Sequence, residues 1–164
     1  MNPYRLLQIV IALGTVMIGV FLNVTCCSAS DINLSQGATV YVPVYSHIYI
    51  GIKGYRFDLA ISLSIRNTDP NGPIVVSSVA YHDSTGKLVK EFLEKPREIA
   101  PLASAEFFVS ESDTTGGFGA SFLVKWASKT KVNQPIIEGV MAGTSSAQGI
   151  SFTSRGQVIE DSGQ

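Results

Sequence analysis

The fold is decided by Arg56-Phe-Asp-Leu-Ala-Ile-Ser-Leu-Ser-Ile-Arg-Asn-Thr68, a stretch in which apolar residues recur at every second position. Charged or hydroxyl-bearing residues fill most of the positions between them. A period of two is typical of a β-strand that buries one face, because successive side chains of a strand point to opposite faces. The stretch therefore predicts a half-buried strand whose core face carries Phe57, Leu59, Ile61, Leu63 and Ile65.

The same short period recurs along the chain, between turns that are rich in glycine, proline and asparagine. We predict strands at residues 39–50, 56–68, 74–82, 87–93, 104–111, 120–127, 136–142 and 149–153. After residue 30 no segment shows the apolar period of an amphipathic helix over three turns. These strands predict an all-β fold, and the proline-containing connection at residues 94–103 favours an immunoglobulin-like Greek-key β-sandwich of seven or eight strands.

An apolar run precedes the predicted strands. Leu6–Leu22 contains no charged residue, Arg5 stands before it, and Cys26-Cys-Ser-Ala-Ser30 follows it. This layout is typical of an N-terminal signal peptide or membrane-anchor helix. We therefore expect an exported protein, whose domain lies in the periplasm or on the outer side of the membrane.

The residues after the apolar run leave three fates open. Cleavage after Ala29 or Ser30 would release the protein, because small residues stand where signal peptidase requires them. Lipidation of Cys26 or Cys27 would make it a lipoprotein, although neither cysteine follows the small residue that a lipobox prefers. An uncleaved run would anchor the chain, with Arg5 favouring an N-terminus on the inner side.

The chain has room for one domain behind this leader. Of its 164 residues, 134 follow Ser30, which is enough for a single hydrophobic core. We expect a signal peptide or anchor at residues 1–30, a lead-in at 31–38, one β-sandwich domain at 39–156 and a frayed tail at 157–164.

The charge and cysteine content of the domain exclude several classes of function. Arg5 is the only charged residue before residue 31, so the rest of the chain keeps 11 of the 12 basic residues and all 13 acidic ones. This balance argues against nucleic acid as a partner, and against membrane contact other than through the leader or a lipid. Both cysteines lie in the leader region, so the domain has no disulfide and no cysteine-based metal or catalytic site. We expect no metal and no cofactor.

The first predicted strand carries an aromatic face. Tyr41, Tyr45, His47 and Tyr49 alternate with valine and isoleucine, and Pro43 places the strand at a sheet edge or at a bulge. Two interpretations of this face remain open. The rings can pack beneath a neighbouring loop or strand, with their hydroxyl groups on backbone partners. Alternatively, they form a binding surface for a glycan or a partner protein.

One turn resembles the start of a calcium-binding loop. Asn67, Asp69, Asn71 and Gly72 follow the order of oxygen ligands and glycine in such loops. However, the twelfth position is Ser78 instead of glutamate, and the flanking segments are predicted strands. We therefore interpret these residues as a turn that Asn and Asp side chains hold together.

The remaining polar motifs predict no catalytic residue. His82 and Asp83 are neighbours at a predicted hairpin, where adjacent strand residues point to opposite faces, and turn capping by Asp83 is favoured over a catalytic pair. The glycine-rich segment 113–119 lacks the lysine of a phosphate-binding loop, and the serines of 143–149 lack the surroundings of a nucleophile elbow. Arg155 could bind a carboxylate or pair with an acidic residue of a neighbouring strand.

Five segments together resemble a known bacterial family. They are Tyr41-Val-Pro-Val-Tyr-Ser-His47, Leu63-Ser-Ile-Arg-Asn-Thr-Asp-Pro70, Gly86-Lys-Leu-Val89, Pro101-Leu-Ala-Ser104 and Gly149-Ile-Ser-Phe-Thr-Ser-Arg-Gly156. These segments, in this order, resemble sequences of the family catalogued as domain of unknown function 3124. The resemblance covers about Gln36 to Val158. The resemblance implies an exported bacterial protein, and it brings no activity, cofactor or catalytic residue.

We expect a non-catalytic binding or structural module of the bacterial envelope, with an envelope protein or a glycan as partner. Two alternatives remain. One is a hydrolase whose Asp and Glu residues come together only in the fold. The other is a subunit that contributes an edge strand to a larger envelope complex.

The fate of the leader can be measured directly. The intact mass of the protein recovered from its native host should match residues 31–164 or 30–164 after cleavage, or a cysteine carrying diacylglycerol after lipidation. The mass of the complete chain would show an uncleaved anchor. Recovery of the protein from the cytoplasmic fraction would contradict export.

Overall fold

The structure is a computed structural model that describes residues 34–145 and 148–161. The predicted leader helix, with Cys26 and Cys27, lies outside these residues. In the part that is described, no helix is long and apolar enough to cross a membrane.

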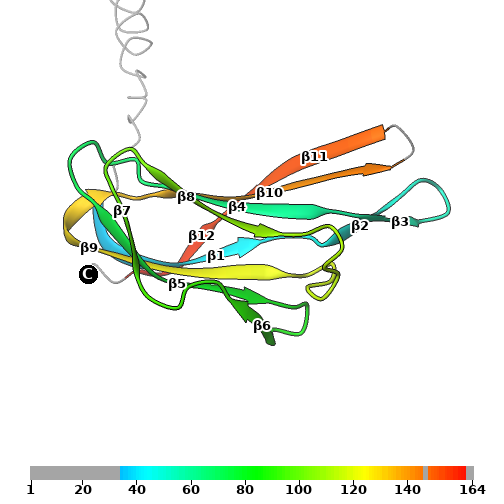
Figure 1. Cartoon of the computed structure of the whole chain (residues 1–164), viewed down its shortest axis with the longest axis horizontal. Coiled ribbons are helices and arrows are strands. Elements are labelled where there is room, and N and C mark those ends of the chain that lie inside the picture. Colours follow the sequence, from blue (N-terminus) through cyan, green and yellow to red (C-terminus); the bar gives the residue numbers. More distant parts are fainter. Residues whose placement is uncertain (1–33, 146–147, 162–164) are drawn as a thin grey trace, which may run out of the picture. The chain divides into compact units, whose positions relative to one another are not determined.

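The described residues form antiparallel strands that belong to three sheets (Figure 1). The strands are β1 (Leu34–Pro43), β2 (His47–Ile50), β3 (Tyr55–Asp58), β4 (Ala60–Arg66), β5 (Ile74–His82), β6 (Leu88–Glu91), β7 (Arg97–Ile99), β8 (Ser104–Val109), β9 (Ser121–Asn133), β10 (Ile136–Ser145), β11 (Gln148–Arg155) and β12 (Gln157–Asp161). The prediction of an all-β fold is confirmed.

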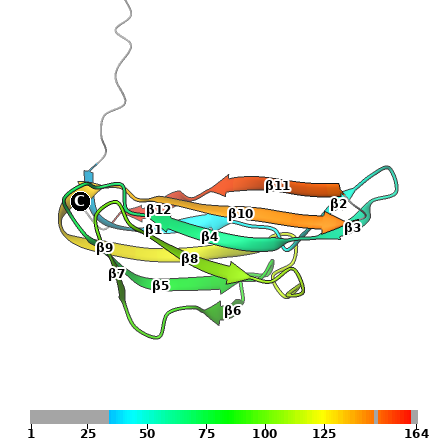
Figure 2. The ribbon, with the colours of Figure 1, turned by 45° about the horizontal axis from the view of Figure 1, so that its top comes forward.

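Two of the sheets are large. Sheet I has the strand order β12-β1-β9-β5-β6, with β7 also pairing with β5, and sheet II has the order β11-β10-β4-β8. The chain passes between these two sheets from β4 to β5, from β7 to β8, from β8 to β9, from β9 to β10 and from β11 to β12. Strands β2 and β3 form a separate hairpin, which projects at the same end as the last residues of β10 and the first residues of β11 (Figure 2).

The alternating stretch at residues 56–68 behaves as predicted on its core face. Phe57, Leu59, Ile61, Leu63 and Ile65 are all buried, and they belong to one apolar cluster that includes residues of both large sheets. The stretch nevertheless forms two strands. Strand β3 pairs with β2 in the hairpin, and β4, which follows it, belongs to sheet II.

The prediction of seven or eight strands is wrong, since twelve strands lie in the described residues. One reason is that the run 39–50 is interrupted. The backbone N–H groups of Val44 and Ser46 donate to the carbonyls of Ala120 and Gly117, at 2.9 and 3.2 Å, so the chain turns away from sheet I there. The run therefore divides into β1 and β2.

Pro43 predicted that the first strand lies at an edge or bulges at this residue, and neither alternative holds, because the register shifts of β1 lie between Ser35 and Gly37 and between Thr39 and Val40. Strand β1 pairs with β12 on one side and with β9 on the other. Pro43 is tolerated because it is the last residue of β1 and lies beyond Tyr41, where the pairing with β12 stops. Its missing N–H therefore costs no hydrogen bond to β12.

Both ends of the predicted domain extend further than the sequence indicated. Strand β1 begins at Leu34, inside the predicted lead-in, and Gln157–Asp161 form β12 where a frayed tail was predicted. The turn into β12 depends on Gly156, because a Cβ atom there would lie 2.7 Å from Val40 Cγ1 and 2.9 Å from the Ile137 carbonyl oxygen. A short polar strand at the end of a chain carries little periodic signal, so composition alone did not reveal it.

The turn after β4 is held by Asp69 and Asn67, as interpreted from the sequence. Asp69 Oδ1 accepts hydrogen bonds from the N–H groups of Asn71 and Gly72 at 2.9 and 2.7 Å, and Oδ2 accepts one from Asn133 at 2.9 Å. The Asn67 amide donates to the carbonyls of Gly72, Ile99 and Ala100. Both carboxylate oxygens of Asp69 thus hold protein N–H groups, which favours a structural role over calcium binding.

The stability that Asp69 contributes should depend on pH in a defined direction. The N–H groups of Asn133, Asn71 and Gly72 lower the pKa of Asp69 from its usual 3.8. A lowered pKa in the folded state gives stability that is complete above the usual pKa and is lost as the pH falls through the lowered value. We expect Asp69→Asn to unfold at a lower urea concentration than the wild type at neutral pH, because one acceptor becomes an N–H donor.

The difference between the two proteins should shrink as the pH falls from about 5 to about 2. The other carboxylates are present in both proteins and cancel in this comparison. A difference in unfolding free energy that stays constant over this range would contradict the assigned role of Asp69.

Candidate functional site

Five aromatic rings from three distant segments meet beside the β2–β3 hairpin. The Tyr45 ring packs on Phe118 at 5.1 Å and on Phe152 at 6.0 Å between ring centroids. The His47 ring packs on Tyr49 at 5.3 Å and on Phe118 at 6.1 Å. We call these five residues the aromatic strip.

The aromatic strip is positioned by hydrogen bonds that link the β1–β2 segment to the loop between β8 and β9. Ser46 is fully buried, and its hydroxyl donates to the Gly117 carbonyl at 3.1 Å, the same carbonyl that accepts its backbone N–H. Gly117 has a φ of 75°, and a Cβ atom there would lie 2.6 Å from Ser84 Oγ. This conformation favours glycine, and it places the next residue, Phe118, against Tyr45.

The strip combines a buried anchor with exposed rings. His47 is 8% exposed, whereas Tyr49 is 62% and Phe118 is 51% exposed. Beside them lies a shallow groove of about 370 Å³, which is lined by Tyr45, Ile48, Phe118, Phe152, Thr153 and Ser154. No acidic or basic residue is among these lining residues, so the groove suits an uncharged, partly apolar ligand.

The sequence predicted part of this site. Tyr45, His47 and Tyr49 come together, but Tyr41 lies on β1 within sheet I and takes no part in the ring contacts of the strip. Neither interpretation of the aromatic face holds for every residue, because His47 is packed while Tyr41 and Tyr49 are exposed.

Sequence reasoning missed the two phenylalanines of the strip. Phe118 stands between glycines in an exposed loop, and an aromatic residue in such a loop is a usable signal of a contact surface. Phe152 had no such signal, because it alternates in β11 like any strand residue. Only the pairing of β11 with β10 brings it close to Tyr45.

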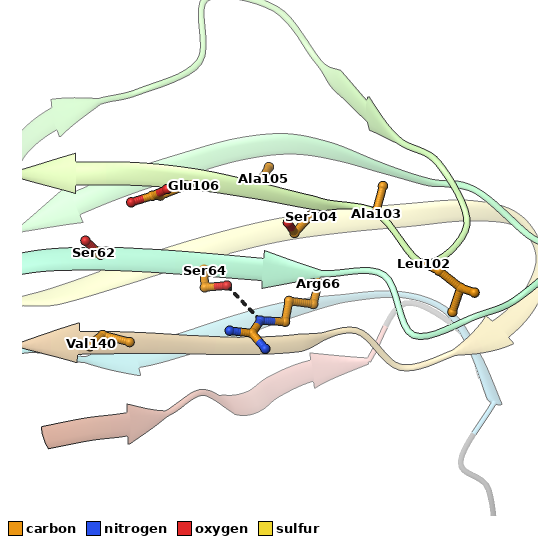
Figure 3. A pocket seen from close by; sticks show the side chains of 9 residues that line it. All are labelled: Ser62, Ser64, Arg66, Leu102, Ala103, Ser104, Ala105, Glu106 and Val140. Carbon is orange, nitrogen blue, oxygen red and sulfur yellow. Dashed lines mark hydrogen bonds between the residues drawn. The ribbon is translucent and has the colours of Figure 1, made fainter.

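A second groove, of about 470 Å³, lies on the outer face of sheet II (Figure 3). It is lined by Ser62, Ser64, Arg66, Leu102, Ala103, Ser104, Ala105, Glu106 and Val140. Arg66 Nε donates to Ser64 Oγ at 3.1 Å, and its guanidinium lies 3.6 Å from Glu138 Oε1. Glu106 is the one carboxylate that lines this groove, so the pair of carboxylates that a hydrolase needs is not found in it.

The other polar candidates have structural partners. Asp83 Oδ1 accepts hydrogen bonds from the hydroxyl and the N–H of Thr85 and from the N–H of Lys87. The Thr85 hydroxyl is the largest cause of the lowered pKa of Asp83. The prediction that Asp83 caps the hairpin turn is confirmed. Among residues 34–145 and 148–161, no group of three His, Cys, Asp or Glu side chains is placed to hold a metal ion.

Comparison with known proteins identifies the family. The model of the family described as Protein of unknown function (DUF3124) matches residues 37–159. The chain belongs to this family. The resemblance noted in the sequence is thereby confirmed.

No curated protein matches this DUF3124 chain. Among solved structures, the one described as "Crystal Structure of Thermotoga maritima 1070" is similar to it, with 17% sequence identity and a TM-score of 0.44. That similarity covers 79% of this chain and 99% of the other.

The role of Ser46 in holding the strip can be tested by stability. Ser46→Ala removes the hydroxyl bond to Gly117 and should lower the free energy of unfolding by about 1 kcal/mol, the usual contribution of one hydrogen bond. The control is Ser110→Ala, because the Ser110 hydroxyl bonds to Ser112 at an exposed position. Equal effects of the two changes in urea unfolding would argue against a special role for Ser46.

Proposed function

We propose that this protein is an exported, non-catalytic binding module of the bacterial envelope, and that the aromatic strip is its contact surface. The observation that carries the proposal is the exposure of Tyr49 and Phe118. Both rings are more than half exposed although they pack on the nearly buried His47 ring. Their positions are thus held by contacts within the protein.

Such an arrangement is favourable for binding. Exposed aromatic rings lose unfavourable contact with water when a partner covers them, and rings held in place lose little conformational entropy. The adjacent groove adds the hydroxyl groups of Thr153 and Ser154 to an aromatic surface. A mostly apolar site with a few polar groups is the usual composition of a binding surface.

Export is supported by the leader alone. The uncharged run Leu6–Leu22 and the cysteine pair Cys26 and Cys27 favour secretion, lipidation or anchoring on the outer side of the membrane. The domain behind them has no cysteine. It is therefore independent of the redox state of its compartment.

The proposed architecture is a sandwich of immunoglobulin-like kind. The pairings β4–β8 in one sheet and β5–β9 in the other support it, because they correspond to the central pairs of an immunoglobulin sandwich. The outer strands are arranged differently. β1 pairs with β9, and β10 pairs with β4, so the first strand and a late strand have exchanged sheets.

The proposal is tested by two matched phenylalanine substitutions. Phe118 belongs to the strip and is 51% exposed, whereas Phe108 lies on β8 outside the strip and is 56% exposed. We expect Phe118→Ala to reduce binding of the tagged protein to washed envelope preparations of its host about tenfold, the loss of an aromatic contact worth about 1.4 kcal/mol.

Phe108→Ala should bind these preparations like the wild type. The result that would contradict the proposal is equal binding by both variants and the wild type. Circular dichroism of both variants checks that neither change disturbs the fold.

A further inference from the structure

Strand β11 has an open edge. It pairs with β10 on one side, and no other strand among the described residues pairs with it (Figure 2). Its residues from Gln148 to Ser154 include no charged side chain. The strand at the opposite edge of the sheet, β8, contains the charged residue Glu106. Sheet edges are usually protected by charges, prolines or bulges, because their backbone groups otherwise pair with another chain. The register between β10 and β11 shows no bulge.

The direction of the open backbone groups follows from the pairing. Gly156 N–H donates to the Ile137 carbonyl at 2.8 Å, and the next pair in the register is Arg155 with Glu138. In an antiparallel pair, residues that bond to each other alternate with residues whose N–H and C=O point away. The outward groups are therefore those of Gly149, Ser151, Thr153 and Arg155, spaced by two residues, or about 6.8 Å.

The groove of the aromatic strip lies along this same edge. Phe152, Thr153 and Ser154 of β11 line it on one side, and Tyr45 and Phe118 line it on another. An extended chain that bonded to the outward groups of β11 would therefore place side chains over the aromatic rings. Because side chains of a strand alternate between its faces, every second residue of that chain would meet the groove.

The positive charge of Arg155, the last residue of β11, indicates that the partner carries a negative charge nearby. Arg155 is exposed, and neither of the two ion pairs found among the described residues includes it. An arginine in this position attracts a carboxylate. The groove itself has no acidic or basic lining residue and favours uncharged side chains.

We propose that β11 and the aromatic strip together bind an extended peptide segment of a partner protein, which adds to sheet II as a further strand. The segment has apolar side chains at alternate positions and a carboxylate beside Arg155. A glycan fits the rings but not the outward N–H and C=O groups, whose regular spacing matches a peptide backbone. This inference rests on the proposed function, since it names the partner of the same site.

The test uses the full chain in mild detergent and a phage-displayed library of random seven-residue peptides as the probe. We expect enrichment of peptides that alternate apolar residues and carry Asp or Glu near one end. Two synthetic versions of an enriched peptide are then compared, each with N-methyl groups on one alternate set of amides. Methylation of the set that faces β11 should weaken binding more than about tenfold, and methylation of the other set should change it less than about threefold.

A charge exchange tests the end of the site. Arg155→Glu should weaken binding of the acidic peptide about tenfold, and a peptide with lysine in place of the acid should recover it. Lys125→Glu, an exposed change on β9 in the other large sheet, is the matched control and should leave binding unchanged.

Equal binding of the two methylated peptides, or enrichment without alternation, would overturn strand addition. If Phe118→Ala still reduces envelope binding in that case, the proposed function stands and an uncharged glycan becomes the occupant to test. If instead the peptide binds as expected and Phe118→Ala leaves envelope binding unchanged, strand addition stands and the proposed envelope role fails.

Discussion

The backbone between Val44 and Ser46 must satisfy its hydrogen bonds while it passes out of sheet I, and the end of the domain that carries the site depends on how it does so. Ala120 and Gly117 accept the N–H groups of Val44 and Ser46, and the Ser46 carbonyl accepts the N–H of Leu59. Three segments are thereby joined at a fully buried serine. The hairpin, the glycine-rich loop and the entry into β4 all take their positions from this junction.

Local sequence predicted the parts of the structure that depend on neighbours in the chain. The alternation from Phe57 to Ile65 identified a core face, and Asp83 with Gly86 identified a hairpin turn. The side chains of Asn67 and Asp69 bond to residues nearby in the same turn. In each case the residues that carry the pattern lie within a short segment, although Asn67 and Asp69 also bond to the distant Ile99 and Asn133.

What the sequence could not reveal depends on pairing between distant residues. Pro43 suggested an edge or a bulge because proline lacks an N–H, yet the pairing of β1 with β12 stops at Tyr41 and leaves Pro43 without a partner on that side. The strip contains Phe118 and Phe152 because a loop and an outer strand converge on Tyr45. No spacing rule connects residues 45, 118 and 152. The partner of a strand is decided by the whole sheet arrangement, which explains why the site was only half predicted.

Strand β1 also acts as a spacer. Its ten residues run from Leu34 to Pro43, a rise of about 30 Å at the usual 3.3–3.4 Å per residue. The aromatic strip begins two residues after its end, at Tyr45. Asp161, the last described residue, pairs with Ala38 of β1, and its carboxylate accepts a hydrogen bond from the Ser35 hydroxyl at 3.0 Å, so it lies beside the first half of β1. The first and last described residues, Leu34 and Asp161, therefore lie away from the aromatic strip, and a partner that covers the strip has no need to displace either of them.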